Sequence, residues 1–233
     1  MYDEADFASP IRMPQFPSTR WSLIRRSGLS SDGRVAFGEL TRLYRPAIVA
    51  FFRVRLGADA AEDAAQSFLA ASFEQVWWPR ADAGLGSFRS FLLLLLRRHA
   101  GHVRDAAALP LDDANDGSDI ADDTADAERR FDSRFALLLT AQAIEAQRAR
   151  YRERARGALF ERLLPLLSAP PEHGELKALA AELDMPPNTL TVEIQRLRKR
   201  LREDMRAQLG ELCADAATFE AEWAALQRVL DGS

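Results

Sequence analysis

Apolar residues spaced three and four positions apart dominate this chain, and this helical period restricts the possible folds more than any other feature. The clearest stripe, between residues 35 and 55, consists of Phe37, Leu40, Tyr44, Ile48, Phe51 and Phe52. Further helices are predicted over residues 59–77, 87–104, 129–168, 175–183, 187–208 and 215–230. The strict alternation typical of half-buried strands is missing. The sequence therefore predicts an all-α fold.

The chain has 233 residues, a length that suits one large domain or two small domains of roughly 100 residues each. We expect a disordered arm (1–17), a first helical domain (18–106), an acidic flexible linker (107–128), a second helical domain (129–212) and a C-terminal helix (213–233). We expect a cytoplasmic protein, because the longest apolar run has six residues, far below the roughly 20 that a membrane helix needs. The single cysteine excludes an internal disulfide.

The charge is unevenly distributed, and this changes what the net charge of −4 means. Nine acids and no Lys or Arg lie between Asp105 and Glu128, so the rest of the chain carries +5. Residues 20–104 hold 13 Arg against seven acids, which makes this block basic. Residues 148–208 hold 11 Arg and two Lys against nine acids, so two basic blocks flank an acidic connector. The connector is either a solvated spacer or a strap that mimics nucleic-acid charge and covers a basic face.

Residues 175–202 form the most specific local pattern, two short helices separated by a tight turn at Asp184 and Met185. Pro186 and Pro187 would start the second helix, where a proline costs little because the first amides lack partners anyway. This is the pattern of a helix-turn-helix. The face opposite the apolar stripe offers Asn188, Thr189, Thr191, Gln195, Arg196, Arg198 and Lys199. Short hydrogen-bonding groups suit base edges and the later cations suit phosphates, so we expect DNA binding here. The alternative is an ordinary helical hairpin with a charged face.

Four stretches in the expected order resemble the small two-domain sigma factors of the extracytoplasmic-function type, in the sigma-70 family. These are TRWSLI with ELTRLYRPAIVAFFR, AAEDAAQSFLAASFE, GSFRSFLLLLLRRHAGHVRD and LAAELDMPPNTLTVEIQRLRKRLRE. Together they span roughly residues 19–206. The resemblance implies a protein without catalysis or cofactor that binds core RNA polymerase and directs it to promoter DNA.

The resemblance also assigns roles to residues. The acidic helix would dock on polymerase through Glu62, Asp63 and Gln66. The end of the third helix would approach the −10 element through Arg97, Arg98, His102 and Arg104. The seven polar residues of the helix-turn-helix listed above would read the −35 element. The runner-up is a DNA-binding regulator that does not recruit polymerase.

The acidic helix departs from the family pattern, because Ala60 and Ser67 stand where acids are common. Lost charge should weaken docking on polymerase, and phosphorylation of Ser67 would restore it by adding about −1.5 to −2 charges. This makes a Ser/Thr kinase a possible partner, with an anti-sigma factor as another. A third reading is a sigma-like protein held off DNA until such a partner acts.

The histidines do not lead to a metal site. His99 and His102 lie three apart on one predicted helix, a spacing that can bind a metal, but His173 is distant in sequence. Structural or DNA-facing roles are favoured for both. We find no phosphate-cradling glycine loop and no Ser-His-Asp or Cys-His grouping, so no enzyme activity is expected.

Overall fold

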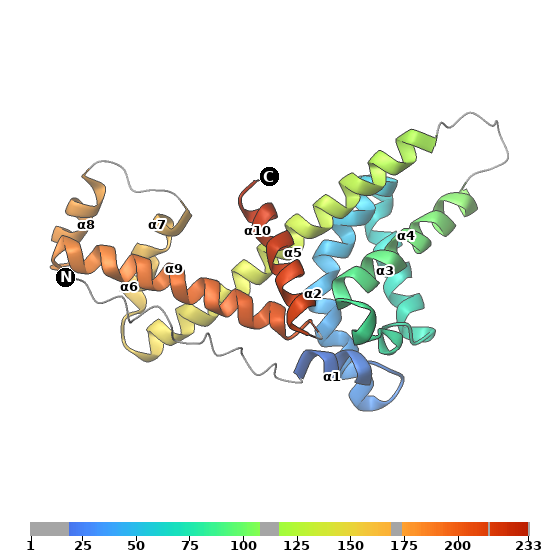
Figure 1. The fold of residues 1–233 in the computed structure, drawn as a ribbon, viewed down its shortest axis with the longest axis horizontal. Helices are drawn as coiled ribbons and strands as arrows, with labels where there is room; N and C mark the ends of the chain where they lie inside the picture. The colour runs from blue at the N-terminus through green and yellow to red at the C-terminus, as the bar shows by residue number, and fades with distance from the viewer. Residues whose placement is uncertain (1–18, 108–116, 169–173, 214, 233) are drawn as a thin grey trace.

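The computed structural model describes residues 19–107, 117–168, 174–213 and 215–232, and every regular element in these ranges is a helix (Figure 1). The α-helices are α1 (Thr19–Arg26), α2 (Ser31–Leu56), α3 (Ala58–Glu74), α4 (Phe88–Ala107), α5 (Gly117–Glu153), α6 (Gly157–Leu163), α7 (Pro165–Ser168), α8 (Glu175–Glu182), α9 (Pro187–Gly210) and α10 (Ala216–Leu230). Two single turns of 3-10 helix, Trp78–Arg80 and Ala83–Leu85, precede α4. The all-α prediction is confirmed.

The first hydrophobic cluster forms where α2 packs against α3, α4 and the first half of α5. The ring of Tyr44 stacks on Phe135 with 5.5 Å between centroids, and Trp78 is fully buried beside them. Pro46 lies inside α2 and not in its first turn. Along α4, Leu92 is fully buried while Leu94 is 40% exposed, so one side of this helix faces solvent.

The second hydrophobic cluster lies around α6, α7, α8 and the first half of α9. Its fully or nearly buried members are Tyr151, Phe160, Leu163, Leu166, Leu179, Ala180, Leu190, Ile194 and Leu197. Helices α5 and α9 run through both clusters, and Leu201 of α9 packs against each of them. The two clusters therefore share two long helices.

The predicted acidic linker differs from the structure over residues 117–128, which form the first turns of α5. Adding turns to a helix that tertiary packing already fixes costs much less than nucleating a new one. Ala127 is fully buried within the first cluster, and acidic residues near a helix N-terminus interact favourably with its dipole. Residues 108–116 of that linker, like the predicted arm, lie outside the described residues.

Helix α10 packs back onto the first cluster through Phe219, Trp223 and Leu226 (Figure 1). The guanidinium of Arg206 lies 4.7 Å from the ring centroid of Phe219 and 2.9 Å from a carboxylate oxygen of Glu220. Stacking of this kind stabilises a contact beyond the area that it buries. The end of the chain thus covers the junction of α5 and α9.

A buried group of charges joins α10 to the rest of the first cluster. Arg89 of α4 donates to Glu222 of α10 at 2.7 Å and lies 3.1 Å from Asp132 of α5. Ser87 also donates to Glu222, at 2.8 Å. Burial raises the pKa of Asp132 to about 6, although Arg89 acts to lower it. One cation therefore holds two carboxylates from two other helices.

Candidate nucleic-acid interface

A left-handed residue makes the turn between α8 and α9. Asp184 has a φ of 51°, a conformation that Asp and Asn tolerate better than most side chains. The amide of Met185 donates to Ala180 at 2.9 Å, and the amide of Asp184 donates to Ala181 at 3.3 Å. These two bonds form a Schellman motif, which ends α8 and satisfies its last carbonyls. The turn predicted at Asp184 and Met185 is confirmed.

The start of α9 also follows the prediction. Pro186 is the extended residue before the helix, and Pro187 occupies its first position. The carbonyl of Pro186 accepts the amide of Leu190 at 3.1 Å, so the proline before the helix still closes its first turn. Leu190, Ile194 and Leu197 are buried in the second cluster. The opposite face of α9 is thereby oriented toward solvent.

The sequence patterns did not predict one buried acid of α9. Glu193 is 6% exposed and accepts a hydrogen bond from the Tyr151 hydroxyl at 2.8 Å. Arg156 lies 3.2 Å from the same carboxylate oxygen. Burial and this hydrogen bond raise the pKa of Tyr151 to about 12. The sequence held one sign of this: Glu193 lies on the apolar stripe formed by Leu190, Ile194 and Leu197, where a charged residue requires a partner.

Six of the seven predicted −35 residues lie exposed on α9, and two of the seven form hydrogen bonds within the fold. The exposed residues are Asn188, Thr189, Gln195, Arg196, Arg198 and Lys199. Thr191 is half-buried, and its hydroxyl donates to the carbonyl of Pro187 at 3.0 Å. Arg198 donates to the carbonyl of Leu166 at 2.7 Å and so ties α7 to α9. This bond uses one nitrogen of an exposed guanidinium, so the DNA-facing role of Arg198 stays a prediction. The sequence could not reveal the bond, because the fold of 157–168 decides it.

The end of α4 presents a second basic surface. Arg98 and His102 are exposed there, whereas the guanidinium of Arg97 pairs with Glu128 of α5. That pairing raises the pKa of Arg97. Arg104 lies in the same helix, but its side chain is outside the described part of the structure. Of the three predicted −10 residues whose side chains the structure describes, Arg97 already has an acidic partner.

The predicted polymerase-binding residues lie together on the outer face of α3. Glu62, Asp63 and Gln66 are all exposed. Glu62 forms an ion pair with Arg45 of α2 at 2.6 Å, and Gln66 lies at the edge of an apolar hollow beside Phe37. Asp63 has no ion pair within the described residues.

Ser67 lies on the same face of α3, beside α4. It is exposed, and its hydroxyl lies 3.4 Å from Nε2 of His99. The ring of His99 packs edge-on against Phe52 and Phe68. Burial, and then the neighbouring His102, lower the pKa of His99. His99 therefore links Ser67 to the helix that carries the predicted −10 residues.

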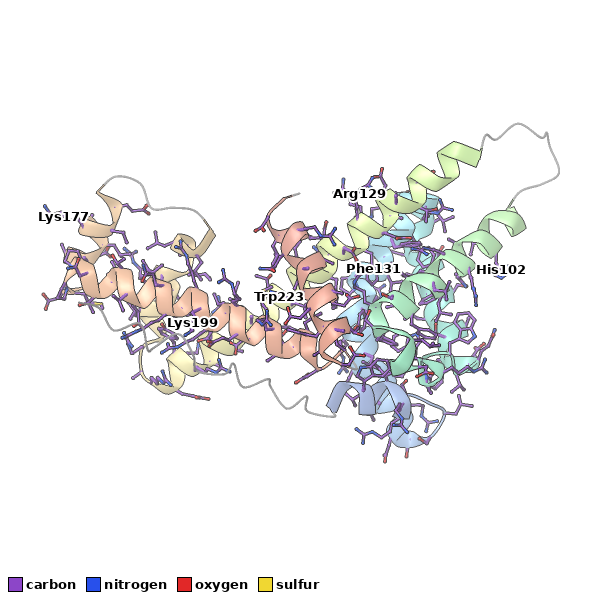
Figure 2. The ribbon with its side chains drawn as sticks, in the orientation of Figure 1. His102, Arg129, Phe131, Lys177, Lys199 and Trp223 are labelled. Carbon is purple, nitrogen blue, oxygen red and sulfur yellow. The ribbon has the colours of Figure 1, made fainter. Side chains whose placement is uncertain are left out.

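The two predicted DNA-facing surfaces lie apart along the long axis of the molecule. Figure 2 shows His102 toward one end and Lys177, on the first helix of the helix-turn-helix, toward the other, with Lys199 between them. Helices α5 and α9 connect these ends and pack against each other. Any ligand that touched both surfaces would have to extend along the molecule.

Comparisons with models of known protein families, with curated proteins and with solved structures give no match. In the described parts of the chain, no three His, Cys, Asp or Glu side chains cluster closely enough to hold a metal ion. No helix among those residues has the length and apolar character needed to cross a membrane.

Proposed function

We propose that this chain is a sigma factor of the extracytoplasmic-function type, which binds core RNA polymerase and directs it to promoter DNA. The observation that carries the DNA-binding part is the face of α9, where Asn188, Gln195 and Lys199 are exposed at helical spacing. A recognition helix needs hydrogen-bonding groups for base edges and cations for phosphates, and this face offers both. The order of the family-like stretches along the chain supports the polymerase-binding part.

Run-off transcription with purified bacterial core polymerase tests the proposal. Transcripts that require both this protein and a defined promoter would support it. DNA binding without transcripts would instead support the second candidate, a helix-turn-helix regulator that does not recruit polymerase. One observation favours this second candidate. Within the proposed polymerase-binding set, Glu62 is already paired with Arg45, which leaves Asp63 as the only acid of the set without an ion pair among the described residues.

Replacing Gln195 with Ala should reduce specific DNA binding more than nonspecific binding. A base-reading side chain contributes about 1–3 kcal/mol of discrimination, so we expect roughly a 5- to 100-fold loss for the preferred sequence. Lys199→Ala is the comparison, because losing a phosphate contact should weaken all sequences similarly and lower the salt dependence. The preferred sequence is first selected from a random duplex pool, and affinities are then measured at several salt concentrations. Equal losses on selected and random DNA for Gln195→Ala would contradict base reading.

We also propose that phosphorylation of Ser67 strengthens polymerase binding. Ser67 is exposed next to Asp63, so a phosphate would add about −1.5 to −2 charges to the acidic face of α3. Ser67→Glu should therefore bind core polymerase more tightly, mainly through a faster association rate. Ser67→Gln is the matched neutral control. Identical association rates for the two variants in surface plasmon resonance would refute this regulation.

The acidic start of α5 is proposed to restrain the end of α4. Glu128 pairs with Arg97, so this acid occupies a cation that the resemblance assigns to promoter DNA. Glu128→Gln should release Arg97 and raise affinity for a single-stranded −10-type oligonucleotide by roughly two- to fivefold, the value of an exposed ion pair. Asp126→Gln is the control, because Asp126 pairs with Arg129 on its own helix. A similar gain in both variants would show that net charge alone matters.

A further inference from the structure

A groove on the outer surface between α2 and α5 has no role in the functions described so far. It encloses about 780 Å³ and lies above the packed interface of the two helices. Arg45 and Arg53 of α2 line one side, and Arg130 and Arg134 of α5 line the other. Among the described residues that line it, Glu62 is the only acid. The groove therefore has a strong excess of positive charge.

Most of this charge is uncompensated. Arg45 is paired with Glu62 at 2.6 Å, whereas Arg53, Arg130 and Arg134 form no ion pair with any described residue. All four arginines are exposed. The three unpaired arginines around this concave surface repel one another, so an anionic occupant would lower the electrostatic energy of the groove.

Between the arginines the groove is mainly apolar, although Ser133 of α5 also lines it. Val49, Val54 and Pro46 come from α2, and Leu137 comes from α5. Leu137 is 56% exposed, which leaves a large aliphatic side chain in contact with water. Covering this side chain would stabilise a complex through the hydrophobic effect. An occupant must therefore bring apolar groups as well as negative charge.

An acidic amphipathic helix has both properties. Arg130 and Arg134 are four residues apart on α5, about 6 Å along the helix axis, and acids four apart on a partner helix have the same spacing. An apolar stripe between such acids would meet Val49 and Leu137. A nucleic acid fits less well, because none of the described residues that line the groove is aromatic and they offer bases no stacking surface.

We propose that this groove binds an acidic amphipathic helix of a partner protein, with Arg53, Arg130 and Arg134 pairing with its acids and Leu137 covering its apolar stripe. Its binding does not depend on the proposed sigma function.

The test uses the full chain and a fluorescein-labelled synthetic 15-residue peptide. The peptide carries Leu three and four positions apart with Glu on both flanks, and a scrambled peptide of equal composition is the control. Fluorescence anisotropy measures binding at two salt concentrations. We expect binding of the patterned peptide, weaker at the higher salt concentration because ion pairs are screened. Equal affinity for the scrambled peptide, or no binding, would overturn the proposal.

Variants locate the binding to the groove. Arg130→Glu with Arg134→Glu should weaken the patterned peptide at least about tenfold, because two attractive pairs become repulsive. The matched control, Arg152→Glu with Arg154→Glu, makes the same charge change outside the groove, at exposed positions in the last turn of α5 and just after it. Leu137→Ala should weaken binding with little effect on folding. Equal weakening by groove and control variants would overturn the proposal, as would stronger binding of a single-stranded oligonucleotide at the same arginines.

A regulatory consequence rests on the proposed function. Glu62 belongs both to the groove and to the proposed polymerase-binding face, and a peptide acid would compete with it for Arg45. The patterned peptide should therefore change the affinity of the chain for core polymerase, and this effect should disappear in Arg45→Met. If polymerase does not bind at all, the proposed function fails while the peptide measurement still decides the groove.

Discussion

Replacing Arg89 with Met should lower the free energy of unfolding by about 3–5 kcal/mol, because it leaves two carboxylates without their shared cation in a buried site. The Arg89 side chain is 16% exposed, and those of its partners Glu222 and Asp132 are 10% and 25% exposed. Methionine keeps much of the volume, so the loss would be electrostatic and not a packing defect. Urea unfolding followed by circular dichroism measures the change.

Arg98→Met is the matched control for this prediction. Arg98 lies exposed on the same helix, so the free energy of unfolding should change by no more than about 0.5 kcal/mol.

The pH dependence of the free energy of unfolding supplies an independent check. In the folded protein the pKa of Asp132 is raised to about 6. Protonation of Asp132 therefore stabilises the fold: this contribution is complete at a pH below the pKa of an unfolded Asp, and it is lost as the pH rises through about 6. Removing Arg89 raises that pKa further, so the variant should recover part of its loss on acidification. If Arg89→Met lost the same free energy of unfolding at every pH, the electrostatic origin of the loss would be contradicted.

Replacing Ala141 with Pro should lower the free energy of unfolding by about 3 kcal/mol or more, because it breaks α5 near the point where this helix passes from the first hydrophobic cluster to the second. Ala141 is exposed, so the new ring removes an intrahelical hydrogen bond and clashes with the preceding turn without filling a core position. We also expect the clusters to unfold separately in the variant, since α5 would no longer transmit order from one to the other.

The tryptophans make this separation measurable. All four pack in or against the first cluster: Trp21, Trp77, Trp78 and Trp223. Their fluorescence therefore reports on the first cluster, whereas circular dichroism reports on all helices. In the wild-type chain both signals should change over the same range of urea concentration. In Ala141→Pro the circular dichroism signal should be lost over a wider range of urea concentration than the fluorescence. Ala141→Ser is the control and should behave like wild type. Coincident transitions in Ala141→Pro would show that α9 alone couples the clusters.

The local pattern of the sequence predicted the helix-turn-helix closely. The predicted helices at 175–183 and 187–208 correspond to α8, Glu175–Glu182, and α9, Pro187–Gly210. The helical period, the two prolines and an Asp that tolerates a turn are local signals, because each restricts the backbone conformation of the residues close to it in sequence.

The acidic connector shows where local composition misleads. Its many Asp residues favour a linker, yet residues 117–128 continue α5 toward the N-terminus. The composition of a segment indicates which structure that segment would form in isolation. In the folded chain, Phe131, Phe135 and Leu139 already fix the helix that this segment extends.

The sequence by itself determined the all-α class, most helix boundaries and the polar face of α9, because these depend on neighbours within a few residues. Only the tertiary structure decided which charges are available. Arg97 faces Glu128, Arg198 holds the carbonyl of Leu166, and Arg89 is shared between two buried acids. The same packing brought Arg53 of α2 beside Arg130 and Arg134 of α5 without acidic partners. Whether an arginine is free to bind a ligand depends on contacts between residues far apart in the chain, and no local spacing encodes those contacts.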